Sequence, residues 1–170
     1  MDQVDLPETG VVTREVRDAA HDAQHRPRAP IVMADSRRGL GDFPPLIFKM
    51  NAAELARLDG GARDPEDAAR ALSARTGRLV FISMAERGIV AATPGGESIP
   101  VPAHLVRGPI DVVGAGDAVS ANLAAALSAG ADPREAMTLA MAAASVVIHQ
   151  LGTTGTASVE QLAAALDLQF

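Results

Sequence analysis

Short apolar segments alternate along this chain with longer segments of helical pattern, and no other sequence feature constrains the fold as strongly. Strands are predicted at residues 31–34, 46–49 and 79–83, where apolar side chains cluster between charged or turn-forming residues. A hairpin is predicted over residues 88–101, with its turn at residues 94–96. Alternating strands and helices are typical of an α/β layered fold with a largely parallel sheet.

Capping residues, prolines and glycines mark the expected helix ends. Asn51 followed by Glu54 fits a capping box, and Asp64-Pro65 fits the start of a helix that Gly77 ends. The predicted helices cover residues 11–25, a short segment after Asn51, residues 65–76, a segment after Gly116, residues 132–149 and a segment from Ser158.

The composition narrows the class of protein. The 170 residues are 48% hydrophobic and 21% charged, which suits one soluble globular domain or part of one. A net charge of −6 argues against a nucleic-acid binder, and the lack of cysteine excludes disulfides and thiolate metal sites. No apolar run is long enough to cross a bilayer. The N-terminal segment MDQVDLPETG lacks the pattern of a secretory signal, so we expect a cytoplasmic protein that acts on small molecules.

The segment Gly114-Ala115-Gly116-Asp117 precedes a long alanine-rich helix and is the strongest candidate site. Glycines let several N–H groups turn toward one point, and a helix N-terminus adds partial positive charge, so an anion hole is predicted. A simple turn with a helix cap is an equally weighted alternative for the motif alone. The dinucleotide fingerprint would need glycine where Val119 stands, and no Gly-Lys-Ser/Thr of a P-loop occurs.

Four segments in order resemble the ribokinase-like (phosphofructokinase-B type) carbohydrate kinases. Residues 111–117 are similar to the C-terminal signature of that family, and residues 51–54 to its Asn-x-x-Glu motif. Residues 79–88 are similar to its nucleotide strand, and residues 147–156 to the closing loop beside the adenine. The resemblance begins near Val4 and implies a three-layer α/β/α fold with a mostly parallel sheet. It makes residues 1–170 the C-terminal nucleotide-binding part of such a kinase domain, with the N-terminal part and lid missing.

By this resemblance, Asp117 is the base that accepts the proton of the substrate hydroxyl. A positioned general base is typically worth about 10²–10⁴ in rate. The N–H groups around Gly114, Ala115 and Gly116 are expected to stabilise charge on the transferring phosphoryl group. A helix-cap role for Asp117 is compatible with this assignment.

The resemblance also implies nucleotide and Mg²⁺ contacts. Glu54 is expected to hold Mg²⁺ through water, because magnesium keeps much of its hydration shell. A plain capping box remains an alternative for Asn51 and Glu54, and Met141 with Met137 also fits a core stripe. The expected nucleotide contacts are Asn51, Glu54, Ser83, Glu86, Gly88, Gly116 and Met141.

A monovalent-cation site, with potassium as the expected ion, is implied near the closing loop. Its oxygen ligands would suit a hard cation. The implied ligands are the Asp111 carboxylate, the carbonyls of Val113, Val147, Gln150 and Gly152, and the Thr156 hydroxyl.

Several residues depart from the family pattern without removing a charged catalytic group. Ala85 stands where the nucleotide strand usually has glycine, and Val119 where phenylalanine often follows the catalytic aspartate. Met50 stands where proline often precedes the asparagine. We therefore interpret these changes as divergence within the family.

Other candidate side chains favour structural roles. His21 and His25 lie one helical turn apart, but they lack the glutamate of a zinc-protease helix and are predicted to be solvated. His149 is predicted to pack at a helix end. Arg37 and Arg38 are predicted to form a solvated basic turn, with phosphate binding as the alternative.

The resemblance predicts an enzyme that transfers a phosphoryl group from ATP to a hydroxyl of a sugar or sugar-like substrate. The segment 35–37 favours the heptose-kinase-like branch. A truncated, non-catalytic nucleotide-binding module that needs a partner for the missing half is the alternative. A vitamin-precursor kinase is ranked lower, because its loop often carries a cysteine. No nucleic-acid or membrane partner is expected, and a homodimer remains an open alternative.

Overall fold

The computed structural model describes residues 10–37, 39–61 and 63–167. The described chain divides into two compact units. The first comprises the residues up to Met84 together with Val90–Ile99, and the second comprises Ala85–Ile89 and the residues from Pro100 onward. The start of the family resemblance near Val4, the segment 1–9 and Arg38 lie outside the described residues.

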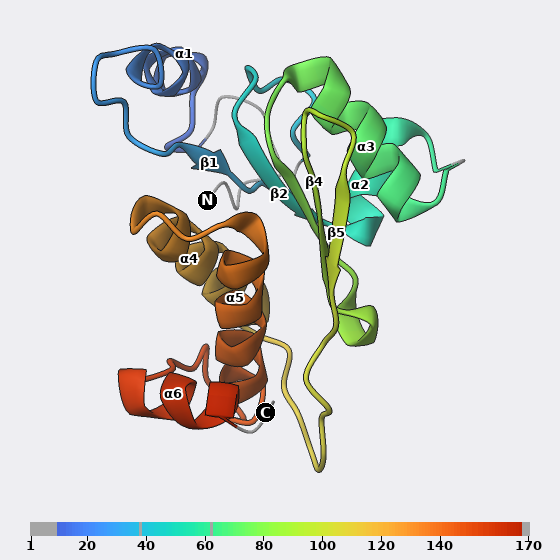
Figure 1. The fold of residues 1–170 in the computed structure, drawn as a ribbon, viewed down its shortest axis with the longest axis vertical. Helices are drawn as coiled ribbons and strands as arrows, with labels where there is room; N and C mark the ends of the chain where they lie inside the picture. Colours follow the sequence, from blue (N-terminus) through green and yellow to red (C-terminus); the bar gives the residue numbers. More distant parts are fainter. Residues whose placement is uncertain (1–9, 38, 62, 168–170) are drawn as a thin grey trace. The chain divides into compact units, whose positions relative to one another are not determined.

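Five strands form one sheet in the order β1-β2-β3-β4-β5, which can be followed in Figure 1. The strands are β1 (Met33–Ala34), β2 (Ile47–Asn51), β3 (Val80–Ser83), β4 (Ile89–Ala92) and β5 (Ser98–Val101). The pairs β1–β2 and β2–β3 are parallel. The predicted hairpin is confirmed as β4 and β5, which are neighbours joined by a turn in which Thr93 N–H donates to the Glu97 carbonyl at 3.0 Å.

Helices follow the strands as the alternation predicts, so the α/β class is confirmed. The helices are α1 (Arg14–Ala23), α2 (Ala52–Asp59), α3 (Pro65–Thr76), α4 (Ala115–Ser128), α5 (Pro133–Val147) and α6 (Val159–Asp167), with a 3₁₀ turn η1 at Ala85–Arg87. None of the helices in the described part of the chain is long and apolar enough to span a membrane.

The helix ends follow the predicted capping chemistry. Asn51 and Glu54 form a complete capping box, as do Asp132 and Glu135 at the start of α5. Gly77 ends α3 in the left-handed conformation, with φ of 66°. These local hydrogen bonds satisfy N–H groups that a helix start would otherwise leave without partners.

Some predicted boundaries differ from those of the structure. The first helix starts at Arg14 and ends at Ala23, so it is shorter than the predicted 11–25. The first strand is only Met33–Ala34, because its backbone pairs with β2 over two residues. The second strand extends beyond residue 49 to Asn51, whose extended backbone also caps α2.

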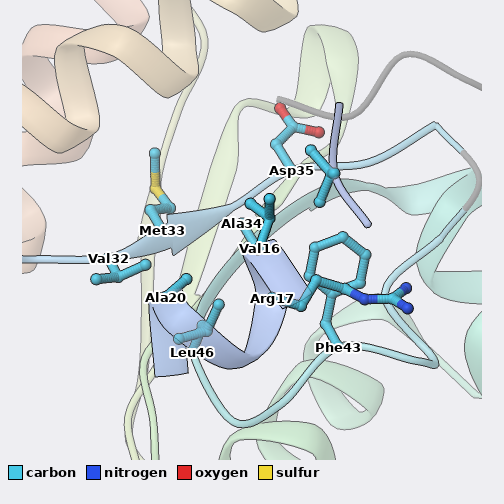
Figure 2. Close-up of a pocket in the computed structure, with 10 residues that line it drawn as sticks. Val16, Arg17, Ala20, Val32, Met33, Ala34, Asp35, Phe43 and Leu46 are labelled. Atoms are coloured by element: carbon cyan, nitrogen blue, oxygen red, sulfur yellow. The ribbon is translucent and has the colours of Figure 1, made fainter. Parts of the chain in front are cut away.

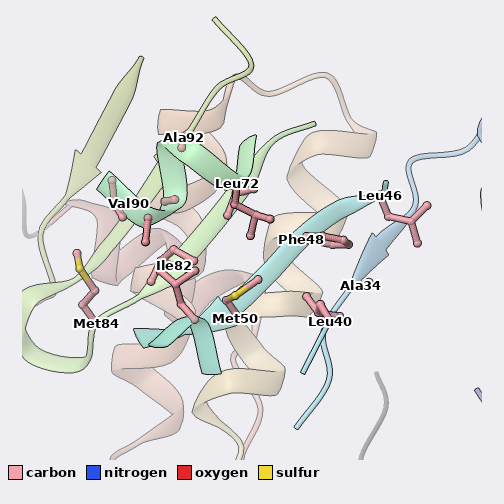
Figure 3. Packing of buried hydrophobic residues seen from close by; sticks show 14 residues of the cluster. Ala34, Leu40, Leu46, Phe48, Met50, Leu72, Ile82, Met84, Val90 and Ala92 are labelled. Atoms are coloured by element: carbon pink, nitrogen blue, oxygen red, sulfur yellow. The ribbon is translucent and has the colours of Figure 1, made fainter. Parts of the chain in front are cut away.

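The core of the first unit lies between one face of the sheet and helices α2 and α3. Phe48, Met50 and Ile82 alternate along β2 and β3 with residues that face the other way, and they pack with Leu55 and Leu72 (Figure 3). All five side chains are almost fully buried. Burial of such apolar groups supplies the main driving force for this unit.

The second unit is built on helices α4 and α5, which pack against each other. Alanine dominates the buried positions of α5, and larger apolar residues such as Leu123 of α4 and Met137 of α5 are fully buried beside them. Val119 is 4% exposed, so the residue that breaks the dinucleotide fingerprint serves as a core residue of α4.

Candidate functional site

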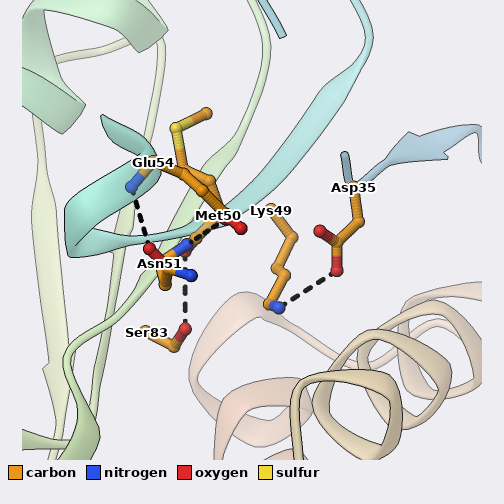
Figure 4. Close-up of polar contacts among 6 residues, drawn as sticks. All are labelled: Asp35, Lys49, Met50, Asn51, Glu54 and Ser83. Atoms are coloured by element: carbon orange, nitrogen blue, oxygen red, sulfur yellow. Dashed lines mark hydrogen bonds and ion pairs between the residues drawn. The ribbon is translucent and has the colours of Figure 1, made fainter. Parts of the chain in front are cut away.

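Asn51 joins the end of β2 to the start of α2 and sits in the centre of a polar group in the first unit (Figure 4). Its Oδ1 accepts from Glu54 N–H at 2.8 Å, while Asn51 N–H donates to Glu54 Oε2 at 2.8 Å. Within the described chain, Asn51 Nδ2 and Glu54 Oε1 have no hydrogen-bond partner. The capping role therefore uses one polar atom of each side chain and leaves the other for a ligand.

Ser83 ends β3 directly beside Asn51. The parallel register pairs Asn51 with Ser83 and Lys49 with Phe81. Ser83 Oγ lies 3.5 Å from the Met50 carbonyl oxygen, which is the outer limit of a hydrogen bond. The structure thus brings together three of the predicted nucleotide contacts, Asn51, Glu54 and Ser83, at the carboxyl end of the sheet.

An ion pair next to this group was missed by the sequence analysis. Lys49 Nζ lies 3.0 Å from Asp35 Oδ2, and the two side chains are 5% and 13% exposed. Lys49 lies within a segment that the sequence analysis treated only as an apolar strand. The sequence did carry a signal for this ion pair, because Lys49 is a charged residue in the middle of an apolar strand segment.

In the second unit, Gly114 forms the N-cap of α4 with φ of 83°. A Cβ at this position would overlap the carbonyl of Thr154. Glycine is therefore required both for the backbone conformation and for the close approach of the closing loop. The Thr154 carbonyl of the closing loop thus lies directly against the start of α4.

The N–H groups at the start of α4 are not all available to a ligand. Ala115 N–H donates to the Val112 carbonyl at 3.2 Å, which closes a turn. Neither Gly116 N–H nor Asp117 N–H has a hydrogen-bond acceptor within the described residues, as is usual in the first turn of a helix. These two groups can receive an anion at this helix start.

Asp117 lies in the first turn of α4 and is exposed. Its carboxylate accepts no hydrogen bond from any described residue. The side chain therefore does not cap its own helix, and it can accept a hydrogen bond from a bound molecule.

Asp111 links the glycine loop to the closing loop. Its Oδ1 accepts from Val113 N–H at 3.0 Å and its Oδ2 accepts from Gly152 N–H at 3.1 Å, while its own N–H donates to the Ile148 carbonyl at 2.8 Å. The side chain of Gln150 forms two hydrogen bonds with the backbone of Thr156, at 2.6 Å and 3.0 Å.

The geometry of these two loops fits the residues expected to bind a monovalent cation. Every expected donor is an oxygen, which suits a hard cation, and the structure gathers Asp111, Gln150, Gly152 and Thr156 in one pair of loops. The Val147 carbonyl already accepts from Gln150 N–H at 3.0 Å, and both Asp111 oxygens accept backbone N–H groups. Each of these oxygens keeps a second lone pair, so the set is compatible with the ion.

The remaining nucleotide candidates lie apart from these loops in the sequence. Glu86 is an exposed residue of η1, and Met141 is 9% exposed within α5. Gly88 has φ of 89°, and a side chain there would overlap the backbone of Val101 and Ala103. Ala85, where the family usually has glycine, adopts a left-handed φ of 52°.

The histidines make local contacts. His149 is exposed; its Nδ1 lies 2.7 Å from the Ser145 carbonyl oxygen and its Nε2 lies 3.0 Å from the Arg107 carbonyl oxygen. The rings of His21 and His25 meet edge to face, with centroids 4.6 Å apart. The described residues contain no group of three or more acidic or histidine side chains placed to hold a metal ion.

A small pocket of about 110 Å³ lies between α1 and β1 (Figure 2). Val32, Ala34 and Phe43 form part of its apolar wall, and Arg17 lies over the Phe43 ring at 5.4 Å. Asp35 lines the pocket from the side of the ion pair. None of the residues expected to bind nucleotide or cation from the sequence lines it.

A family comparison bears on this geometry. The model of the pfkB family of carbohydrate kinases matches residues 10–160. The chain belongs to this family. The pfkB match includes both polar groups described above, the one around Asn51 and the one around Gly114.

Individual relatives of the pfkB chain agree with this. The bifunctional protein HldE of Rhodopseudomonas palustris is 35% identical over 149 residues, which cover 85% of this chain and 30% of that protein. The chain thus spans under a third of the length of this relative.

Solved structures show the ribokinase-like fold. Arabidopsis thaliana ribokinase, solved with ribose and ATP, has a TM-score of 0.72 and 22% identity, over 89% of this chain and 51% of that one. A ribokinase II from E. coli, solved with ATP and Mg²⁺, has a TM-score of 0.63 and 21% identity, over 72% of this chain and 39% of that one. The expected ribokinase-like α/β fold class is thereby confirmed.

Proposed function

We propose that the protein takes part in ATP-dependent phosphoryl transfer to a hydroxyl of a sugar or sugar-like substrate. The observation that carries this proposal is the start of α4. There an exposed Asp117 carboxylate lies beside the N–H groups of Gly116 and Asp117, which donate a hydrogen bond to no described residue. Membership of the pfkB family supports it. ATP is bound in both ribokinase structures named above and Mg²⁺ in the one from E. coli, which supports the same cofactors here.

Asp117 acts as the general base in this proposal. Its carboxylate accepts the hydrogen bond of the acceptor hydroxyl and takes the proton as the oxygen attacks the γ-phosphorus. The bond from that phosphorus to the bridging oxygen of ADP breaks, and ADP leaves. The N–H groups of Gly116 and Asp117, with the positive end of the α4 dipole, stabilise negative charge on the transferring group.

Asn51 and Glu54 serve the phosphates and Mg²⁺. Asn51 Nδ2 donates to a phosphate oxygen, and Glu54 Oε1 holds a water of the Mg²⁺ hydration shell. When bound, Mg²⁺ supplies charge neutralisation for the phosphates. The capping box keeps both side chains in one arrangement, so the alternative of a plain capping box and the ligand role are compatible.

Asp111 and the closing loop form the monovalent-cation site of the proposal, with K⁺ as the ion. Asp111, Gly152 and Thr156 already belong to one hydrogen-bonded loop pair, which is the environment such an ion would reinforce. The ion would then act by keeping the Gly114 loop in position rather than by contacting the substrate.

A nucleotide-binding module without activity of its own is the second candidate. The observation that bears on it is coverage, because the matched residues make up 30% of the HldE relative and 51% of the Arabidopsis ribokinase. In that case another polypeptide would supply the groups that bind the sugar.

Calorimetric titration of the chain with Mg·ATP, with and without K⁺, tests both candidates. We expect saturable binding that K⁺ strengthens. A coupled assay for ADP release with a panel of sugars then separates the enzyme from the binding module. Absence of Mg·ATP binding by the folded chain would contradict both.

A further inference from the structure

Lys49 is the only lysine among the fifteen lysine and arginine residues of the chain, and it is buried. Its ammonium forms the ion pair with Asp35 at 3.0 Å. Moving two charges out of water costs several kcal/mol per ion, and their attraction often fails to offset this cost. A pair of this kind therefore needs an explanation other than stability, and its place in the fold supplies one.

The pair joins the carboxyl end of β1 to the middle of the neighbouring parallel strand β2. Asp35 directly follows β1, and Lys49 is the third of the five residues of β2. In open α/β sheets, ligands bind outside the carboxyl ends of the strands. Asp35 thus lies at the edge of the sheet where this fold places its ligands, and Lys49 lies two residues before Asn51, which ends β2 at the same edge.

Lys49 shares a face of the sheet with Asn51. Phe48 and Met50 point into the apolar core of the first unit, and side chains alternate along a strand, so Lys49 and Asn51 point to the opposite face. Ser83 lies in register with Asn51 on the next strand. Figure 4 shows Lys49 and Asp35 beside the group formed by Asn51, Glu54 and Ser83.

The ammonium of Lys49 can donate more hydrogen bonds than the described residues accept from it. A lysine carries three N–H donors, and Asp35 accepts one of them. In the described residues no second acceptor lies within hydrogen-bond distance. A side chain that is 5% exposed then carries two donors without partners among the described residues, and a bound acceptor can satisfy them.

The choice of lysine at this one position fits such a role. Arginine carries a broad planar fork of five donors and would leave more of them without partners in a buried site with one carboxylate. Lysine is a compact point charge that can contact two acceptors at once. The chain uses arginine for all of its other cationic side chains except histidine.

We propose that Lys49 binds the phosphate groups of the nucleotide and that Asp35 is its positioning residue. This inference rests on the proposed function. Asp35 holds the ammonium beside the end of β1, and a phosphate oxygen accepts one of the remaining N–H groups. The phosphates would then contact Lys49, Asn51 and Ser83 from one face of the sheet.

The single lysine gives the test a direct readout. In the chain labelled with ¹⁵N-lysine, one side-chain ammonium signal is expected, and it should shift on saturation with Mg·ATP but not with MgCl₂ alone. By calorimetry, Lys49→Met should weaken Mg·ATP binding by about tenfold or more, since a hydrogen bond to a charged group is lost. Arg75→Met, which removes an exposed cation from the same unit, should leave the affinity unchanged.

Two further variants separate binding from folding. Asp35→Asn/Lys49→Met replaces the ion pair by neutral groups, so it should unfold at a temperature near that of the wild type while binding as weakly as Lys49→Met. Asp35→Asn alone should bind with intermediate affinity. Wild-type affinity in the double variant would overturn the inference.

The outcomes also separate this inference from the proposed function. If wild type and Lys49→Met bind Mg·ATP equally and the ammonium signal does not move, Lys49 has no role in the site and the proposed function stands. If the wild-type chain does not bind Mg·ATP, the proposed function fails and the inference fails with it.

Discussion

The carbonyl of Thr154 packs against Gly114 so closely that no side chain fits at position 114. Gly114 also has a φ of 83°, which costs an L-residue about 1–2 kcal/mol. The close approach of two loops that are forty residues apart in the sequence therefore requires glycine at position 114.

Gly114→Ala should destabilise the chain by at least about 2 kcal/mol in urea unfolding, since the strained backbone and the overlap both add to the cost. Gly130→Ala is the matched control. Gly130 has φ of 91° with open space around its Cβ position, so it should show the backbone cost alone. Equal losses in the two variants would show that the contact with Thr154 contributes nothing.

Asp117→Asn should lower turnover by at least about 10²-fold with little change in nucleotide affinity, because a general base acts on the transition state more than on binding. Turnover is measured by ADP release and affinity by calorimetry. Asp132→Asn, at the N-cap of α5, makes the same chemical change at a helix start and should have no effect on turnover. Full activity in the Asp117 variant would refute the proposed base.

Ala85→Gly should be neutral or should stabilise the chain by up to about 1 kcal/mol. Glycine removes the strain of the left-handed φ at this position. Part of that gain is offset because glycine raises the conformational entropy of the unfolded chain. Ala71→Gly, in the exposed middle of α3, makes the same change and should destabilise by about 1 kcal/mol. Opposite signs in urea unfolding confirm the strain, whereas a loss of stability at both positions argues against it.

His104 predicts a pH dependence of stability. Burial lowers the pKa of His104 below its ordinary value of 6.5. The unfolded chain then binds more protons than the folded chain between the two pKa values, so stability rises with pH in that window. The contribution is complete above about pH 6.5 and is lost as the pH falls through that value toward the lower pKa of the folded state.

His104→Gln should flatten this slope in unfolding free energies measured from about pH 5 to pH 8. His25→Gln removes an exposed imidazole and serves as the comparison. An unchanged slope in the His104 variant would assign the pH dependence to other groups.

Much of the fold could be predicted because its signals are local. The capping boxes at Asn51 and Asp132 depend on residues three positions apart, and the strand at residues 80–83 is a continuous apolar run. Such patterns determine local structure before any long-range contact forms. The first strand was predicted too long, because its length depends on pairing with β2 and not on its own sequence.

The Lys49–Asp35 pair and the approach of Thr154 to Gly114 could not be predicted from local patterns. The pair requires the parallel register of β1 and β2, and the approach requires the closing loop to return to the start of α4. The departure at Ala85 was visible in the sequence, but its left-handed backbone was not. For the candidate site, the residue types were therefore accessible and their long-range contacts were not.

The two oxygens of Asp111 have a further consequence for motion. Because one carboxylate holds both Val113 N–H and Gly152 N–H, neither loop can separate from the other without breaking a hydrogen bond to a charged group. Amide protons of the two loops should therefore exchange with solvent as a single cooperative unit. If product release requires the two loops to separate, its rate would depend on breaking the hydrogen bonds that the Asp111 carboxylate accepts.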